Sequence, residues 1–360
     1  MRNKLKLIYG FFILFVLASC SKEEVLTPSY SDEDRVGNFV DSCDNQYVKD
    51  IYSKYNCGLM YEFDPILDFA YTAENSNTAE KWGAVEFTQI KTQFLNSSAE
   101  MTDDSLVKYN AYIDKTMTFL DSTLFQYIGD TGVIVDKLPF KVLLAKTIYS
   151  PNSLALSTLI ESDSRVGSTS IGSLNCAYNS NSIALCVDQD ALLYNASKYR
   201  KDNFYIFLCR ILEMNDLYSQ ISDDFYATSS NYYDMSMVEV YANDSSIDLT
   251  DETEVATIPD TLSKAWFYSK GFIDAKYFYN TPTGLTTIDG VAKVIKKTYY
   301  FVEDGDADVR SYLNEAIHRN STELAAFPDE VKAKLVILVE TLEDWGVKIR
   351  EFNPDLEVLF

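Results

Sequence analysis

The stretch Phe204-Tyr-Ile-Phe-Leu-Cys-Arg-Ile-Leu212 is apolar on nearly every side when it is drawn as a helix. A helix with one apolar stripe lies at the surface, whereas a helix that is apolar all round is buried. Asp202 stands just before the stretch and is a residue type that begins helices. We therefore expect a central, buried helix from Phe204 to Ile221, with the other elements arranged around it.

The segments before this helix combine helices with strands. Leu106, Ile113 and Leu120 belong to an apolar series with helical spacing, which predicts a helix over 103–128 that Gly129 ends. The apolar stretch over 137–149, which Ser150-Pro151 ends, predicts a strand, and alternating apolar residues predict a hairpin over 168–188. A shorter helix is expected over 44–56, followed by a strand over 58–63.

The segments after it are predominantly helical in pattern. We expect helices over 262–273, 288–302, 309–319 and 328–352. In the last of them Pro328 suits a helix start, and one apolar stripe includes Leu335 and Leu342. No internal repeat or Gly/Pro-rich linker divides the chain, so we predict one α+β domain over 43–360 with a mostly helical C-terminal half.

Composition excludes several classes of function. The 360 residues carry 31 Lys and Arg against 54 Asp and Glu, a net charge of −23 that would repel a phosphate backbone. We therefore expect no nucleic-acid partner. The single histidine, His318, rules out a zinc site with two imidazoles, and a nucleophile–histidine relay would depend on it. Carboxylate-only chemistry, as in glycoside hydrolysis, is left open.

The first twenty residues have the layout of a lipoprotein signal peptide. Arg2, Lys4 and Lys6 precede an apolar run from Leu7 to Ala18, which is short for a membrane span. The run ends in Leu17-Ala18-Ser19-Cys20, which resembles the site where bacteria cleave before a cysteine and attach lipid to it. We expect a signal peptide over 1–19, lipid on Cys20, and a flexible tether over 20–42. Ser21 in place of Asp, within the acidic sequence Ser-Lys-Glu-Glu, favours the outer membrane and the cell surface.

The order of elements resembles the zinc-binding metallopeptidase lipoproteins of Bacteroidota, which are often encoded beside SusC/SusD-type glycan-uptake systems. The resemblance covers most of residues 45–352 and includes the patches PFKVLLAKTIYS at 139–150 and LVETLEDWGVKI at 338–349. It implies a zincin-like domain, and uptake proteins of the SusC/SusD type as partners.

In that family the central helix carries an HExxH-type motif. The resemblance places Ile206 at the first zinc-binding histidine, Phe207 at the general base and Arg210 at the second histidine. Ile and Phe offer no lone pair, and Arg carries a permanent positive charge. The resemblance therefore implies a catalytically inactive member without a metal cofactor, which binds or scaffolds. The alternative is an active hydrolase that uses an unrecognised metal site or paired carboxylates.

Arg210 and His318 each have a structural explanation as well as a functional one. Arg210 either binds a ligand carboxylate or pairs with an acid such as Glu213, and we favour the pairing. His318 ends a predicted helix beside Arg319, where a cation suits the helix dipole, so we favour a surface position over catalysis.

Four acidic residues have the spacing of calcium ligands in an EF-hand loop, although Val309 stands where that loop needs glycine. The favoured explanation is that acids stabilise the start of the 309–319 helix through its dipole. The weak calcium candidates are Asp304, Asp306, Asp308 and Glu315.

Aromatic residues gather between the central helix and residue 268. Rings stack on sugar faces and their polar atoms bond to hydroxyl groups, so these residues are candidates for binding a glycan or a peptide. The alternative is ordinary aromatic core and rim. The candidates are Tyr226, Tyr232, Tyr233 and Trp266.

Five cysteines follow Cys20, an odd number that leaves at least one thiol unpaired. Cys176 and Cys186 flank a turn-rich stretch and would be able to face each other across a hairpin. We favour two small buried residues in a sheet over a disulfide.

Overall fold

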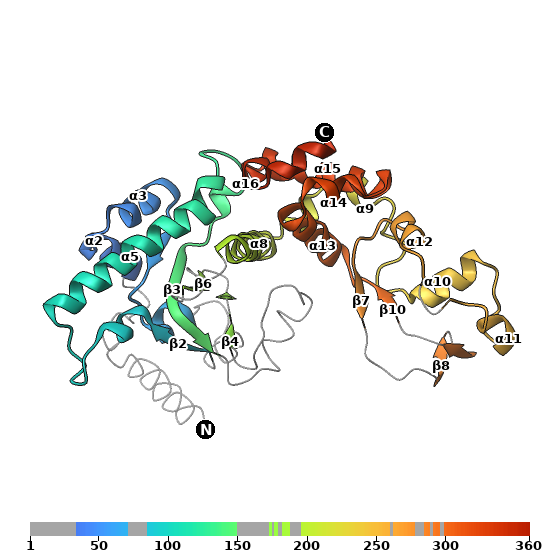
Figure 1. Ribbon diagram of the computed structural model, residues 1–360, viewed down its shortest axis with the longest axis horizontal. Helices are drawn as coiled ribbons and strands as arrows, with labels where there is room; N and C mark the ends of the chain where they lie inside the picture. The colour runs from blue at the N-terminus through green and yellow to red at the C-terminus, as the bar shows by residue number, and fades with distance from the viewer. Residues whose placement is uncertain are drawn as a thin grey trace, which may run out of the picture.

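The computed structural model describes residues 34–70, 85–149, 173–174, 176–178, 182–187, 196–259, 262–277, 284–288, 291–295 and 299–360 (Figure 1). The expected signal peptide over 1–19, the expected lipid attachment at Cys20 and the expected tether up to residue 33 lie outside them. Helices and one small mixed sheet together make the fold α+β, as the sequence predicts. Among the described residues, no helix combines the length and the apolar character needed to cross a bilayer.

The sheet is built around β3, Lys141–Tyr149, whose residues 142 to 145 are fully buried. This strand pairs in parallel with β1 and β6 and in antiparallel with β2 and β4, while β5 pairs with β6 in antiparallel. Continuous apolar runs are typical of strands covered on both faces, which accounts for the predicted strand over 137–149. The other strands are β1 Gly58–Met60, β2 Glu86–Gln89, β4 Ser173–Leu174, β5 Cys176–Tyr178 and β6 Ser182–Cys186.

Helices on the N-terminal side pack beside this sheet (Figure 1). The long helix α5 ends at Thr123, next to its C-cap Leu124, and the short turn η4 follows. The elements are α2 Arg35–Ser42, α3 Gln46–Tyr55, η2 Pro65–Ala70, η3 Ile90–Phe94, α5 Asp103–Thr123, η4 Phe125–Tyr127 and η5 Val135–Lys137.

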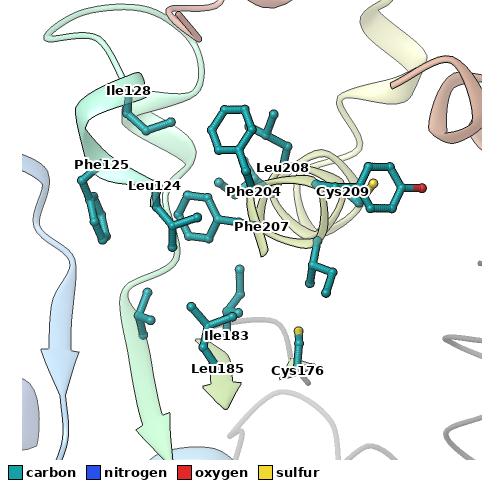
Figure 2. Close-up of a cluster of buried hydrophobic side chains, with 14 of the residues drawn as sticks. Leu124, Phe125, Ile128, Cys176, Ile183, Leu185, Phe204, Phe207, Leu208 and Cys209 are labelled. Atoms are coloured by element: carbon teal, nitrogen blue, oxygen red, sulfur yellow. The ribbon is translucent and has the colours of Figure 1, made fainter. Parts of the chain in front are cut away.

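The central helix α8, Ala196–Met214, begins before Asp202 and ends before Ile221, so the expected bounds Phe204 to Ile221 are wrong at both ends. Its residues 203–209 are buried, as the sequence predicts. Figure 2 shows Phe207 pointing from α8 toward Leu124, with Phe204 and Leu208 on the opposite side of the helix from Ile183 and Leu185. The rings of Phe125 and Phe207 lie 5.9 Å apart in an edge-on arrangement. A helix that is apolar all round is therefore accommodated by contacts on several sides.

The C-terminal helices cover the other side of α8 and close the largest core, which runs from Val36 to Leu356. The ring of Phe352 stacks on Phe204 with 4.0 Å between centroids. The helices and turns after α8 are η6 Tyr218–Gln220, α9 Asp223–Tyr226, α13 Gly305–His318, α14 Ser321–Ala325, α15 Asp329–Asp344, α16 Ile349–Phe352 and η7 Pro354–Leu359.

The described residues between 227 and 302 form a projection at the far end from α2 and α3, which we call the second lobe (Figure 1). It has two small apolar clusters of its own, one around Phe272 and Phe301 and one around Val238 and Val255. Its elements are α10 Met237–Asp244, α11 Glu252–Val255, α12 Lys264–Ser269, β7 Ala275–Tyr277, β8 Gly284–Ile288, β9 Val291–Ile295 and β10 Tyr299–Phe301.

Two expectations about secondary structure are wrong. Within the expected helix over 288–302, residues 291–295 and 299–301 form strands: β9 pairs with β8, and β10 pairs with β7. Their Val, Ile, Tyr and Phe residues favour strands, and Asp289-Gly290 between β8 and β9 is a dipeptide typical of hairpin loops. The expected tether over 20–42 is wrong over its last eight residues, because α2 buries Val36 and Val40 in the core.

Candidate functional site

The positions that correspond to the zinc motif lie in the largest core. Ile206 is 3% exposed and Phe207 is 0% exposed. The rings of Phe125 and Phe207 are in contact, so the Phe207 side chain fills space between α8 and the end of α5. These two side chains contribute packing, and neither has an atom that ligates a metal or accepts a proton.

Arg210, one helical turn further on, is held by neighbours within the chain. Its Nη1 donates to Glu213 Oε2 at 2.6 Å, and its guanidinium lies 4.2 Å from the centre of the Tyr178 ring. The Tyr178 hydroxyl also donates to Glu213, at 2.9 Å. The expected pairing of Arg210 with Glu213 is confirmed.

The four acidic residues do not converge on a cation, so the calcium hypothesis is wrong. Asp304 caps α13 by accepting the backbone N–H of Ala307 at 2.8 Å, whereas Glu315 is paired with Arg319. Asp308 points into the protein interior, as described below, and Asp306 is exposed. The favoured explanation was that acids stabilise the start of this helix. It is confirmed for Asp304, which is the N-cap of α13. Within the described ranges, no group of three or more His, Cys, Asp or Glu side chains is placed to hold a metal ion.

His318 is the last residue of α13 and is part of a local network. Its Nε2 lies 3.0 Å from Asp202 Oδ1, and its Nδ1 lies 2.9 Å from the Asn314 carbonyl oxygen. The His318 side chain is 27% exposed. The network joins the start of α8 to the end of α13, so this histidine connects two helices at the edge of the core.

A buried ion pair lies where the second lobe meets the main core. Lys334 Nζ, on α15, donates to Asp308 Oδ2 at 2.7 Å, to the Gly271 carbonyl oxygen at 2.7 Å and to Ser229 Oγ at 3.0 Å. The hydroxyls of Ser229 and Tyr233 donate to the same Asp308 oxygen. The network therefore joins α13 and α15 to the turn after α9 and to the end of α12.

Aromatic rings complete the surroundings of this ammonium group. Lys334 Nζ lies 4.3 Å from the centre of the Phe225 ring and 4.6 Å from that of Tyr312. Burial disfavours both charges, so it raises the pKa of Asp308 and lowers the pKa of Lys334. The attraction between the two charges shifts both pKa values the other way but does not outweigh burial. The second oxygen of Asp308 is buried and accepts no hydrogen bond.

The four aromatic candidates do not form one platform. Tyr233 is committed to the buried network through Asp308. Tyr226 donates its hydroxyl hydrogen to the Tyr218 carbonyl oxygen at 2.9 Å and packs against the main core. Tyr232 and Trp266 both pack against the Phe301 ring in the second lobe.

A Lys–Asp pair lies against these two rings. Lys270 Nζ is 2.8 Å from Asp244 Oδ2, 5.0 Å from the centre of the Tyr232 ring and 5.8 Å from that of Trp266. Trp266 Nε1 donates to the same Asp244 oxygen at 2.8 Å. We call Tyr232, Asp244, Trp266 and Lys270 the lobe cage.

The lobe cage is open to solvent and keeps its charges. The Asp244 side chain is 34% exposed and that of Lys270 is 13% exposed. Hydrogen bonds from Lys270 and Trp266 lower the pKa of Asp244. Burial opposes the charge of Lys270, but the hydrogen bond to Asp244 and the Tyr232 ring outweigh it and raise the pKa of Lys270.

None of the five cysteines in the described part of the chain forms a disulfide. Cys176 lies opposite Leu185 in the β5–β6 pair, so the register places it away from Cys186. Cys176 is buried and Cys186 is half-buried. The favoured explanation of small residues packed in a sheet is confirmed.

Comparison of the chain with protein-family models, with curated proteins and with solved structures found no match.

Neither Lys334 nor Lys270 was predicted from the sequence, and Asp308 was a candidate for calcium binding rather than for an ion pair. A signal for Lys334 was present, because it follows Val331 by three residues and precedes Leu338 by four, which places it on the apolar stripe of its helix. Nothing comparable marks Lys270, which contacts Asp244 across 26 residues of sequence.

Proposed function

We propose that the protein is a non-catalytic lipoprotein of the outer membrane, exposed at the cell surface, that binds a ligand through the second lobe. The lipid-anchor sequence ending at Cys20 supports the location. The resemblance to peptidase lipoproteins encoded beside SusC/SusD-type systems supports a place next to nutrient uptake, on a zincin-like scaffold.

A binding role is supported by how α8 uses the motif positions. A zinc peptidase needs two metal ligands and a general base on the central helix, whereas Ile206 and Phe207 fill the core there. Arg210 is engaged by Glu213 and Tyr178. Restoring a catalytic set at these positions would bury charged and polar groups without partners, which is costly.

The observation that carries the proposal is the lobe cage. Two half-buried rings stand beside a carboxylate and an ammonium group, and the Asp244 side chain is accessible to solvent. Binding sites for small polar ligands combine a few aromatic surfaces with polar atoms that fix orientation. A glycan or a peptide matches this mixture of surfaces.

Titration of the purified protein with a panel of oligosaccharides and short peptides, followed by calorimetry, tests the proposal. We expect at least one ligand to bind, and Trp266→Ala to weaken it by tenfold or more, the loss expected for about 1.4 kcal/mol at an aromatic contact. Tyr149→Ala, which removes an exposed ring on β3, is the matched control and should leave binding unchanged.

Activity measurements test the other half of the proposal. We expect no hydrolysis of casein or of peptide libraries and no zinc in protein purified without chelator. Hydrolysis that persists at a constant ratio to protein through purification, or one zinc per chain, would restore the hydrolase alternative.

A further inference from the structure

We infer that the lobe cage is a binding site for a primary ammonium group of a ligand, and that Lys270 occupies it in the ligand's place. The inference rests on the proposed function and names the ligand chemistry of the same site. A lysine side chain of a peptide and an amino sugar both present this group.

The contacts of Lys270 define what the cage accepts. Its ammonium group meets one carboxylate oxygen at 2.8 Å and two ring faces at 5.0 and 5.8 Å. Carboxylates and electron-rich ring faces both attract cations, and together they are a known way to hold an ammonium group. The indole Nε1 of Trp266 holds the Asp244 carboxylate in position independently of Lys270, at 2.8 Å. The cage would therefore keep its carboxylate if the Lys270 side chain moved away.

The Lys270 side chain is able to move out of the lobe cage because of its position at the end of a short helix. Lys270 caps the C-terminal end of α12, a helix of six residues, and reaches the cage with a flexible four-carbon chain. An ion pair that is partly exposed contributes little stability, about 0–1 kcal/mol, so exchanging one ammonium group for another costs little.

The stretch of sequence that supplies Tyr232 and Asp244 to the cage is strongly acidic. Residues 211–263 contain twelve Asp and Glu and no Lys or Arg. Asp248, Asp251, Glu252 and Glu254 on this stretch are exposed. Such a field attracts cationic ligands and speeds their encounter with the surface.

Emptying the cage tests the inference. Lys270→Met keeps the length of the side chain and removes its charge. The probes are the peptide acetyl-Lys-Lys-Lys-amide and the glucosamine trimer, with the matched neutral probes acetyl-Nle-Nle-Nle-amide and the N-acetylglucosamine trimer. We expect the variant to bind at least one ammonium probe on the order of tenfold more tightly than the wild type, because Lys270 no longer competes for the cage. Which of the two binds tells peptide from amino sugar.

Two further variants make the result specific. Lys264→Met removes an exposed lysine from the same helix and should leave the affinities of the wild type unchanged. Asp244→Asn, in the wild type and in Lys270→Met, should abolish binding of the ammonium probes. If Lys270→Met does not fold, loss of wild-type binding in Asp244→Asn carries the test alone.

The outcomes separate this inference from the proposed function. Binding of a neutral glycan or peptide that depends on Trp266, without any gain for ammonium probes in Lys270→Met, overturns the ammonium assignment and leaves the binding role in place. Failure of every ligand to depend on Trp266 overturns the use of the lobe cage altogether.

Discussion

Two lysine–aspartate pairs in this protein have nearly the same chemistry and different surroundings. Lys334 and Asp308 are 2.7 Å apart, and Lys270 and Asp244 are 2.8 Å apart. In each pair the ammonium group lies close to aromatic rings: Phe225, Tyr312 and Phe272 around Lys334, and Tyr232 and Trp266 around Lys270. The side chains of the first pair are 4% and 1% exposed, whereas those of the second are 13% and 34% exposed.

The difference in burial separates a structural role from an exchangeable one. Removing two charges from water is costly, so the Lys334–Asp308 pair is tolerated only with the hydrogen bonds from Ser229 and Tyr233 and to Gly271. These bonds join α13 and α15 to residues 229–233 and to Gly271, and so hold the second lobe against the main core. The lobe cage has solvent on one side, where another cation can replace Lys270.

Breaking the buried pair should have the largest effect on stability. Lys334→Met leaves the Asp308 carboxylate buried without its counter-charge, and we expect a loss of about 3–5 kcal/mol in the free energy of unfolding. Urea denaturation followed by circular dichroism measures it. Lys332→Met, two residues away on the same helix, is the control and should change stability by less than about 0.5 kcal/mol. A loss below about 1 kcal/mol for Lys334→Met would mean that the pair is not buried as described.

A double variant tests whether the cost lies in the uncompensated charge. In Lys334→Met with Asp308→Leu no charge remains, and buried pairs replaced by apolar residues are often neutral in stability. We expect the double variant to recover most of the free energy of unfolding that Lys334→Met loses. If the two losses simply add, the two side chains act independently.

The exposed pair should show a much smaller effect. Lys270→Met is expected to lower the free energy of unfolding by about 0–1 kcal/mol, since partly exposed ion pairs are weak. Salt screens exposed charges, so the difference from the wild type should shrink between 0.05 and 1 M sodium chloride, as a denaturation series would show. A loss comparable to that of Lys334→Met would make the lobe cage a structural element and remove the contrast.

Acid should act on the exposed pair in a defined direction. The pKa of Asp244 is lower in the folded protein than its ordinary value of 3.8, so the stability that its ionisation contributes is present above that value. It is lost as the pH falls through the folded pKa. The gap in melting temperature between wild type and Asp244→Asn should therefore be constant from pH 6 to 5 and close below about pH 4. A gap that widens on acidification would contradict the sign.

The sequence predicted the parts of the fold that local patterns control. The helix over 103–128 and the buried helix around Phe207 each show in the spacing of their own residues. The strand β10 was missed because its pairing with β7 joins residues more than twenty apart. The strand β9 was missed although Asp289-Gly290, just before it, is a local hairpin signal. The second lobe's cage was only half visible: Tyr232 and Trp266 were named, but Asp244 and Lys270 are brought to them by packing of α10 against α12.

The cysteines should show a third kind of behaviour, which depends on how deeply each thiol is buried. Burial alone raises the pKa of Cys57 to about 12 and is the main reason that the pKa of Cys176 rises to about 11. Thiolates are the reactive form, so both thiols should be inert at pH 8 in the folded protein. Cys186 is half-buried and should react first with iodoacetamide, as peptide mapping by mass spectrometry would show. Labelling in urea is the control, in which all these cysteines should react at similar rates. Fast labelling of Cys57 in the folded protein would show that the chain around β1 opens. It would contradict the expectation that burial keeps this thiol inert.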